Sequence, residues 1–143
     1  MVTAQAYCTF RVGTLLVGID VARVQEVLHD TELTPVPLAD DSVLGLLNLR
    51  GEIVTAIDAR RRLGLDARPP EVRAAHVLVR CESEVVSLVV DAEDEVVEVD
   101  GAADEVPETL GSAIRALVTG IHQLDTGLLL VLDPDRTLLV TAA

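Results

Sequence analysis

Three histidines are the only imidazoles that could act as a base for a nucleophile in this sequence: His29, His76 and His122. A catalytic Ser, Cys or Thr needs such a base beside it to become reactive. No two of these histidines have the spacing of metal ligands, and no cysteine or aspartate cluster completes a metal-binding set. Cys8 and Cys81 are lone thiols, far apart in the chain. The sequence therefore predicts no nucleophilic catalysis and no metal site.

Carboxylates are frequent between residues 91 and 105, where acid–base chemistry could be sought. A catalytic pair requires that burial or a neighbouring charge drives the two carboxyl groups to different pKa values. These acids instead alternate with small residues in a pattern typical of exposed surface. The sequence also lacks a glycine-rich phosphate loop and a dinucleotide fingerprint. We expect no catalytic residue and no cofactor, and an enzyme that uses these carboxylates remains only a minor alternative.

The polar segment Asn48-Leu49-Arg50-Gly51 interrupts two apolar runs. Gly51 supplies backbone freedom that other residues lack, and the planar guanidinium of Arg50 favours a carboxylate partner. Upstream, Glu26 lies in the stretch Val24-Gln25-Glu26-Val27. The side chains of Glu26 and Arg50 could meet as a bidentate, charge-assisted pair that fixes the geometry of the segment. From spacing alone, two independent surface charges are the simpler interpretation.

Short strands must position these residues, because alternating and β-branched runs dominate the sequence. Residues 6–12 and 14–19 flank Gly13 and predict a hairpin. Further strands are expected at 52–57, 75–80, 85–90, 95–99 and 128–132. Many short strands separated by turns favour a barrel or a sandwich over a parallel sheet.

Helical segments are expected to be few and short, each starting at a capping residue. The predicted helices are 21–28 after Asp20, with His29 at its end; 59–63 after Asp58; one after Asp133-Pro134; and a turn or two at 112–118. Pro69-Pro70 is the clearest break in the chain. We expect a single domain over 1–143 with two β units, 1–68 and 71–143, whose C-terminal segment is free to return to the first unit. No internal sequence repeat is evident.

The net charge of −13 is concentrated in one part of the chain. Residues 82–114 carry 11 acids and no basic side chain. Such a field repels phosphate backbones and anionic lipid surfaces, so neither nucleic acid nor direct membrane insertion is expected. The longest apolar run, Leu128–Leu132, is also too short to span a bilayer. Because no charged-then-apolar signal precedes Tyr7, the expected location is the cytoplasm.

The order of these motifs resembles the CheW family. The matching stretches are Ile19-Asp20, Val24–Val27, Thr34–Pro37, Gly45–Gly51, Asp58–Arg60, Val85–Asp91 and Leu117–Gly120 with 128–133. Asn-Leu-Arg-Gly followed by apolar residues and Asp is the most specific of them. The resemblance extends from about Tyr7 to Leu139, which is nearly the whole chain.

The resemblance implies a mainly β fold in which two small SH3-like, five-stranded β-barrel subdomains pack together with a few short helices. It also implies a non-enzymatic adaptor of bacterial chemotaxis. Such an adaptor couples the cytoplasmic tip of methyl-accepting receptors to the regulatory domain of the histidine kinase CheA, and is recruited to membrane-associated receptor arrays. A scaffold in a chemosensory-like pathway without flagella remains the alternative.

The same resemblance assigns candidate residues to the partner-binding surface. Glu26 and Arg50 match the paired charges of the family, and the neighbouring positions shape that surface. The full set is Val24, Glu26, Gly45, Asn48, Arg50, Gly51, Val86, Val90 and Asp91.

The chain departs from the family pattern at five positions: Thr55, Ala59, Ser87, Glu93 and Asp94. Glu93 and Asp94 make the segment after Asp91 more acidic than is usual in the family. Because like charges at an interface reject partners, this added charge bears on which kinase or receptor the chain serves.

Overall fold

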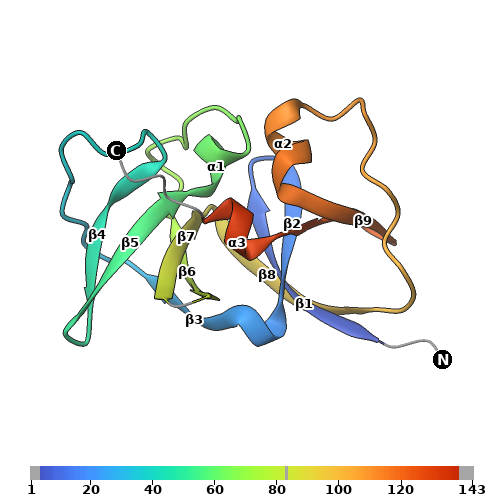
Figure 1. Ribbon diagram of the computed structural model, residues 1–143, viewed down its shortest axis with the longest axis horizontal. Coiled ribbons are helices and arrows are strands. Elements are labelled where there is room, and N and C mark those ends of the chain that lie inside the picture. The colour runs from blue at the N-terminus through green and yellow to red at the C-terminus, as the bar shows by residue number, and fades with distance from the viewer. Residues whose placement is uncertain (1–3, 83, 139–143) are drawn as a thin grey trace.

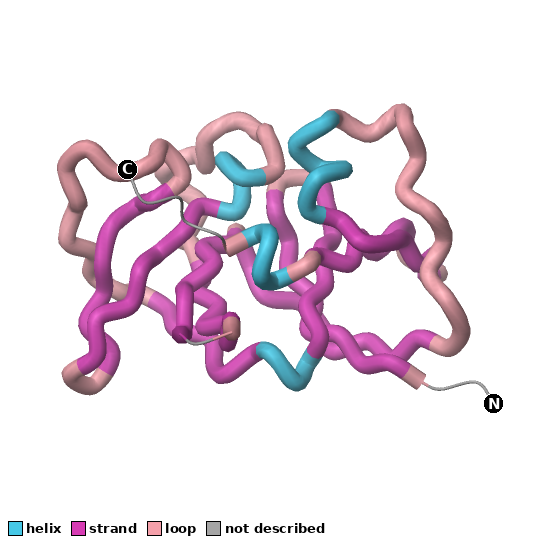
Figure 2. The backbone as a smooth tube through the Cα atoms, in the orientation of Figure 1, coloured by secondary structure: helices cyan, strands magenta, loops and turns pink. Residues whose placement is uncertain are grey.

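The computed structural model describes residues 4–82 and 84–138, which form two five-stranded sheets and a few short helices (Figure 1). The sheets lie side by side, and the short helical segments lie between strands or, for the last of them, after the final strand (Figure 2). The predicted mainly β class with two five-stranded units is confirmed.

The first sheet, sheet A, contains the predicted hairpin around Gly13. Its strand order is β8-β1-β2-β10-β9. The strands are β1 (Gln5–Val12), β2 (Leu15–Asp20), β8 (Ala92–Val99), β9 (Val118–Leu124) and β10 (Gly127–Leu132). All neighbours are antiparallel except β2 and β10, which are parallel.

The second sheet, sheet B, has the strand order β3-β6-β7-β5-β4. Its strands are β3 (Val24–His29), β4 (Val43–Leu49), β5 (Glu52–Asp58), β6 (Ala75–Cys81) and β7 (Glu84–Val90). Here β5 and β7 form the parallel pair, and the remaining neighbours are antiparallel.

The predicted helix over 21–28 is wrong. Asp20 does cap a helical start, accepting a hydrogen bond from the Ala22 amide, but only the 3-10 turn η1 (Val21–Arg23) follows. The chain then becomes β3, which pairs with β6, so His29 ends a strand. The β-branched residues of this segment fit a strand as well as an apolar helical stripe, and pairing with a distant strand decides between them.

The other predicted helices are confirmed. They are α1 (Ala59–Arg62), α2 (Ser112–Leu117) and α3 (Pro134–Thr137). The side chain of Asp58 accepts a hydrogen bond from the Arg60 amide, and that of Asp133 accepts from Asp135 and Arg136. Both carboxylates thus satisfy amide groups that the first turn of a helix leaves unpaired.

The sheets do not divide at residues 68–71 as predicted. Sheet A takes β1 and β2 from the first half and β8–β10 from the second, whereas sheet B takes β3–β5 from the first half and β6–β7 from the second. The first hairpin of the first half, β1–β2, therefore joins β8, β9 and β10 of the second half. In the same way, the first hairpin of the second half, β6–β7, joins β3, β4 and β5 of the first half. The hydrophobic pattern that defines each strand carries no information about this exchange.

The exchange reveals a repeat that the sequence alone did not make evident. The two strand orders correspond position by position, including the single parallel pair. At a constant separation of 75 residues, Val43, Gly45, Leu49 and Asp58 recur as Val118, Gly120, Leu124 and Asp133. Both hairpins also have the same register shift, in which one strand skips a residue and the other does not. In β4–β5 the pair Val43–Ile57 is followed by Gly45–Ala56. In β9–β10 the pair Val118–Leu132 is followed by Gly120–Val131. The expectation that the chain has no internal repeat is therefore wrong: the two sheets are structural repeats of each other.

The core consists of aliphatic side chains and Phe10. One buried cluster joins the two sheets and includes Phe10 and Ile19 of sheet A with Val77 and Leu88 of sheet B. A smaller cluster lies within sheet B: Leu47, Leu49, Val54, Ala56, Leu78 and Val89. This smaller cluster holds the β4–β5 hairpin, and burial of its side chains contributes about 1.5–3 kcal/mol for each large one.

Candidate functional site

The polar segment Asn48–Gly51 forms the tip of the β4–β5 hairpin. Leu49 pairs with Glu52, so Arg50 and Gly51 are the two central residues of a tight turn. Their φ angles are 49° and 91°, as a type I′ turn requires. The side-chain oxygen of Asn48 accepts a hydrogen bond of 2.9 Å from the Gly51 amide. The tip is therefore held by its own polar groups, with the buried Leu47 and Leu49 anchoring its base.

The structure brings Glu26 and Arg50 together. Arg50 Nη2 donates a hydrogen bond of 2.5 Å to Glu26 Oε1, and the side chains are 69% and 31% exposed. Glu26 lies on β3 and Arg50 at the end of β4, the two edge strands of sheet B. The ion pair thus links opposite edges of one sheet. The simpler interpretation, two independent surface charges, is wrong.

A backbone bridge supports the same closure. Thr34 and Leu46 exchange two hydrogen bonds of 2.8 Å, which attach the segment after β3 to β4. This approach is possible because Gly45 has no side chain: a Cβ there would lie 2.6 Å from the Thr34 oxygen. Gly45 also has a φ of +153°, a conformation that favours glycine.

Gly45→Ala is expected to lower the free energy of unfolding by about 2–3 kcal/mol, because backbone must move and the φ angle is strained. Urea unfolding at pH 7 measures this loss. Gly111→Ala is the matched control, since no atom lies within 4 Å of a Cβ added at Gly111. Equal stability of the two variants would show that the Thr34–Leu46 contact is loose.

The remaining predicted residues lie in the interior or at its margin. Val24 is half-buried and packs against the cluster that joins the sheets. Val86 and Val90 are fully buried on β7, so their side chains offer no surface to a partner in this structure. They support the fold beneath any binding surface.

Asp91 is the centre of a nearly buried charge cluster. Its carboxylate accepts hydrogen bonds from Arg60, from Arg68 Nε at 2.8 Å and from the Gly13 amide at 2.7 Å. We call Asp58, Arg60, Arg68 and Asp91 the Asp91 cluster; their side chains are only 10–13% exposed. Gly13 belongs to the β1–β2 turn of sheet A, whereas Arg60 lies on α1 after β5 of sheet B. The cluster therefore connects the two sheets.

Asp91 is strongly stabilised as an anion. Burial alone would raise its pKa, but the hydrogen bonds from Arg60, Gly13 and Arg68 outweigh burial and lower the pKa to about 2. A carboxylate with a pKa of about 2 is fully ionised near neutral pH and is poorly suited to act there as a general acid or base. The arrangement is suited to holding structure.

The structure does bring one imidazole beside a hydroxyl group, His76 beside Ser87, but both residues are buried, so neither is open to a substrate. His76 is buried and its Nδ1 lies 3.1 Å from Ser87 Oγ; burial and the nearby Arg68 lower its pKa. Cys8 and Cys81 are free thiols whose pKa values are raised by burial. Within residues 4–82 and 84–138, no three His, Cys, Asp or Glu side chains gather closely enough to hold a metal ion.

A family model for the CheW-like domain matches residues 6–140. The chain belongs to the CheW-like family. It is 31% identical over 127 residues to the chemotaxis protein CheW of Rhizobium meliloti, covering 88% of this chain and 82% of the relative. It is 26% identical over 137 residues to that of Klebsiella aerogenes, covering 94% and 81%. The resemblance seen in the sequence is thereby confirmed.

The CheW-like fold is also found among solved structures. The crystal structure of the scaffolding protein TtCheW from Thermoanaerobacter tengcongensis superimposes with a TM-score of 0.83. The match has 25% sequence identity and covers 97% of this chain and 100% of that one. No helix among the described residues is long and apolar enough to cross a bilayer.

Sequence reasoning missed two features of this CheW-like chain. Ile53 is 67% exposed on β5 beside the hairpin tip, although it lies in an apolar run that predicts burial. Strict alternation could have identified it, because Val54, its neighbour, is buried. Arg68 completes the Asp91 cluster but lies in a loop, where no local pattern indicates a partner.

Proposed function

We propose that this chain is a non-enzymatic adaptor that couples methyl-accepting chemoreceptors to the histidine kinase CheA. The observation that carries the proposal is the β4–β5 hairpin tip, exposed and fixed by the Glu26–Arg50 pair, in a chain of the CheW-like family. A pre-organised charged tip loses little conformational freedom when a partner binds it.

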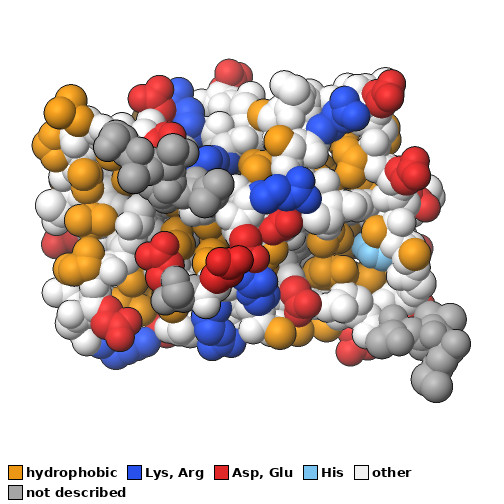
Figure 3. Space-filling model, in the orientation of Figure 1, with side chains coloured by type: hydrophobic (Ala, Val, Ile, Leu, Met, Phe, Trp, Pro, Cys, Tyr) orange, Lys and Arg blue, Asp and Glu red, His pale blue; other side chains and the backbone are white. Residues whose placement is uncertain are grey.

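Apolar side chains beside the tip support a protein partner. Ile53, Leu44 and, in the loop before β4, Val36 and Leu38 are exposed. Hydrophobic side chains are visible over the β4 and β5 end of the molecule (Figure 3). Exposed apolar groups rimmed by charge are typical of protein-binding surfaces. We assign this end to the receptor tip or the kinase regulatory domain, so that a second face remains for the other partner.

The mechanism is bivalent docking. Two faces of one rigid body fix the geometry of receptor and kinase, and no bond is made or broken. The body is rigid because one core cluster and the Asp91 cluster join its sheets. Binding to receptors would in turn recruit the adaptor to the membrane-associated array.

A pull-down with the CheA regulatory domain and a receptor cytoplasmic fragment tests this function. We expect the chain to retain each partner alone and both together in one complex. The acidic segment 82–114 should speed association with a basic partner by electrostatic attraction. Salt screens this attraction, so the association rate should fall as the salt concentration rises. Binding to neither partner, with the chain folded by circular dichroism, would rule out the adaptor function.

A further inference from the structure

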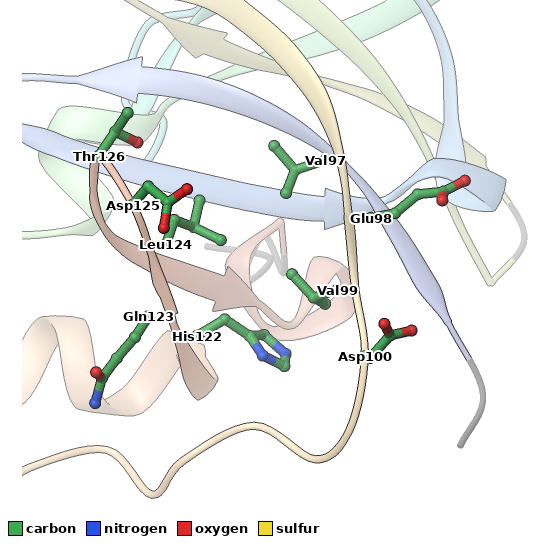
Figure 4. A pocket seen from close by; sticks show the side chains of 9 residues that line it. All are labelled: Val97, Glu98, Val99, Asp100, His122, Gln123, Leu124, Asp125 and Thr126. Carbon is green, nitrogen blue, oxygen red and sulfur yellow. The ribbon is translucent and has the colours of Figure 1, made fainter. Parts of the chain in front are cut away.

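A polar pocket lies where sheet A is open between its two edge strands. The pocket is a cavity of about 430 Å³ between the end of β8 and the β9–β10 turn. It is lined by Val97, Glu98, Val99, Asp100, His122, Gln123, Leu124, Asp125 and Thr126 (Figure 4). The adaptor function proposed above does not use it.

The internal repeat allows this end of sheet A to be compared with the same end of sheet B. Asp125 stands 75 residues after Arg50 and occupies the same place in a two-residue turn, between Leu124 and Gly127. Glu95 precedes Val96 on edge strand β8, as Glu26 precedes Val27 on edge strand β3. Sheet B therefore joins its edges with an Arg–Glu pair, whereas sheet A has an aspartate at the arginine position and cannot form that pair.

The rest of the closure is the same in both sheets. Asp104 and Ile121 exchange backbone hydrogen bonds of 2.8 and 3.0 Å, and Ile121 is the counterpart of Leu46 in the Thr34–Leu46 bridge. The two edges of sheet A are thus brought together by their backbone, as in sheet B. What sheet A lacks is a cation at the position of Arg50.

His122 gives independent evidence for a ligand. The residue is 8% exposed, and its ring extends into the pocket toward the β8 segment at Val99 and Asp100 (Figure 4). Its ring lies beside that of Tyr7, with centroids 6.0 Å apart. Among the described residues neither ring nitrogen has a hydrogen-bond partner. The ring nitrogens are open to the pocket and are not sealed in the core, so they are free to hydrogen-bond a ligand that enters it.

We propose that this pocket receives the guanidinium group of an arginine from a partner protein, which completes sheet A as Arg50 completes sheet B. Asp125 and Asp100 both line the pocket, and either carboxylate can accept hydrogen bonds from the planar fork of donors. The imidazole of His122 offers a flat face and a nitrogen acceptor, while Val97, Val99 and Leu124 contact the side-chain stem. An ammonium group fits less well, because it cannot stack on the imidazole. The excess of acids in residues 82–114 attracts a basic segment.

Two peptides test this assignment with the full-length chain. The probe is acetyl-Ala-Arg-Ala-amide, and its control replaces arginine with citrulline, which has the same shape without charge. The ring resonances of His122, assigned by comparison with His122→Gln, are followed by NMR. We expect a saturable shift with the arginine peptide and binding at least about fivefold weaker with the citrulline peptide.

Variants locate the site. Asp125→Asn should weaken binding of the arginine peptide about fivefold, whereas the matched control Glu71→Gln, which removes the same charge from an exposed position elsewhere, should leave binding unchanged. Circular dichroism checks that both variants are folded. Equal shifts with the two peptides, no shift at His122, or equal effects of the two substitutions would each overturn the proposal.

Discussion

Asp91→Asn is expected to lower the free energy of unfolding by about 2–3 kcal/mol at pH 7. The carboxylate is 10% exposed and accepts hydrogen bonds from two guanidinium groups and one amide. Asparagine keeps the shape but removes the charge, so Arg60 loses its carboxylate partner and Arg68 keeps only its 3.5 Å contact with Asp58. Nearly buried guanidinium groups with too little opposite charge are costly in a way that exposed ones are not.

Urea unfolding of both proteins measures this effect. Glu93→Gln is the matched control. Glu93 is two residues from Asp91, and its side chain is half exposed, so the substitution removes the same charge without leaving a buried group unpaired. The control should change the free energy of unfolding by no more than about 0.5 kcal/mol. A stability of Asp91→Asn equal to that of the control would mean that the Asp91 cluster does not hold the sheets together.

The same carboxylate gives the effect a pH dependence. The pKa of Asp91 is about 2 in the folded chain and 3.8 in its ordinary state. Because the folded value is the lower one, the stabilisation is complete above the unfolded pKa and is lost as the pH falls toward 2. The difference between wild type and Asp91→Asn should therefore be constant above about pH 5 and shrink between pH 4 and pH 2.

Local chemistry made part of this molecule predictable. Asp58 and Asp133 mark two helix starts because a carboxylate before a helix can bind its free amides. The Gly13 hairpin and the alternating strands follow from residue types with a period of two. Residue types and spacing made a Glu26–Arg50 pair only possible, and it was the resemblance to the family that matched the two as paired charges.

Features set by distant contacts could not be predicted in the same way. Residues 24–28 become a strand because β6 lies beside them, and nothing within the segment indicates that neighbour. The exchange of hairpins between halves cannot be predicted from the hydrophobic pattern, because that pattern does not say which sheet a strand joins. Arg68 and Asp91 are 23 residues apart, and only the fold makes them partners.

Arg50→Gly should separate folding from binding. Arg50 has a φ of 49°, which costs a non-glycine residue about 1 kcal/mol. Glycine removes that strain but also removes the exposed pair with Glu26, worth about 0.2–1 kcal/mol. The two effects nearly cancel, so the free energy of unfolding should stay within about 1 kcal/mol of wild type.

Binding affinity, unlike the free energy of unfolding, should change strongly in Arg50→Gly. If the hairpin tip contacts a receptor fragment, loss of Arg50 should weaken that complex about tenfold or more, because arginine is frequent among residues that dominate interfaces. Titration calorimetry with the receptor fragment and the CheA regulatory domain measures each complex separately. Arg50→Lys distinguishes charge from geometry: it keeps the cation but not the bidentate fork.

A charge exchange between positions 26 and 50 separates two roles of Arg50. Glu26→Arg combined with Arg50→Glu keeps an ion pair across the edges of sheet B while reversing the field that a partner meets. If the pair acts only by fixing the tip, the double variant should recover binding relative to either single change. If the partner contacts Arg50 itself, the double variant should bind as weakly as Arg50→Gly. Wild-type affinity in Arg50→Gly would remove Arg50 from the binding surface altogether.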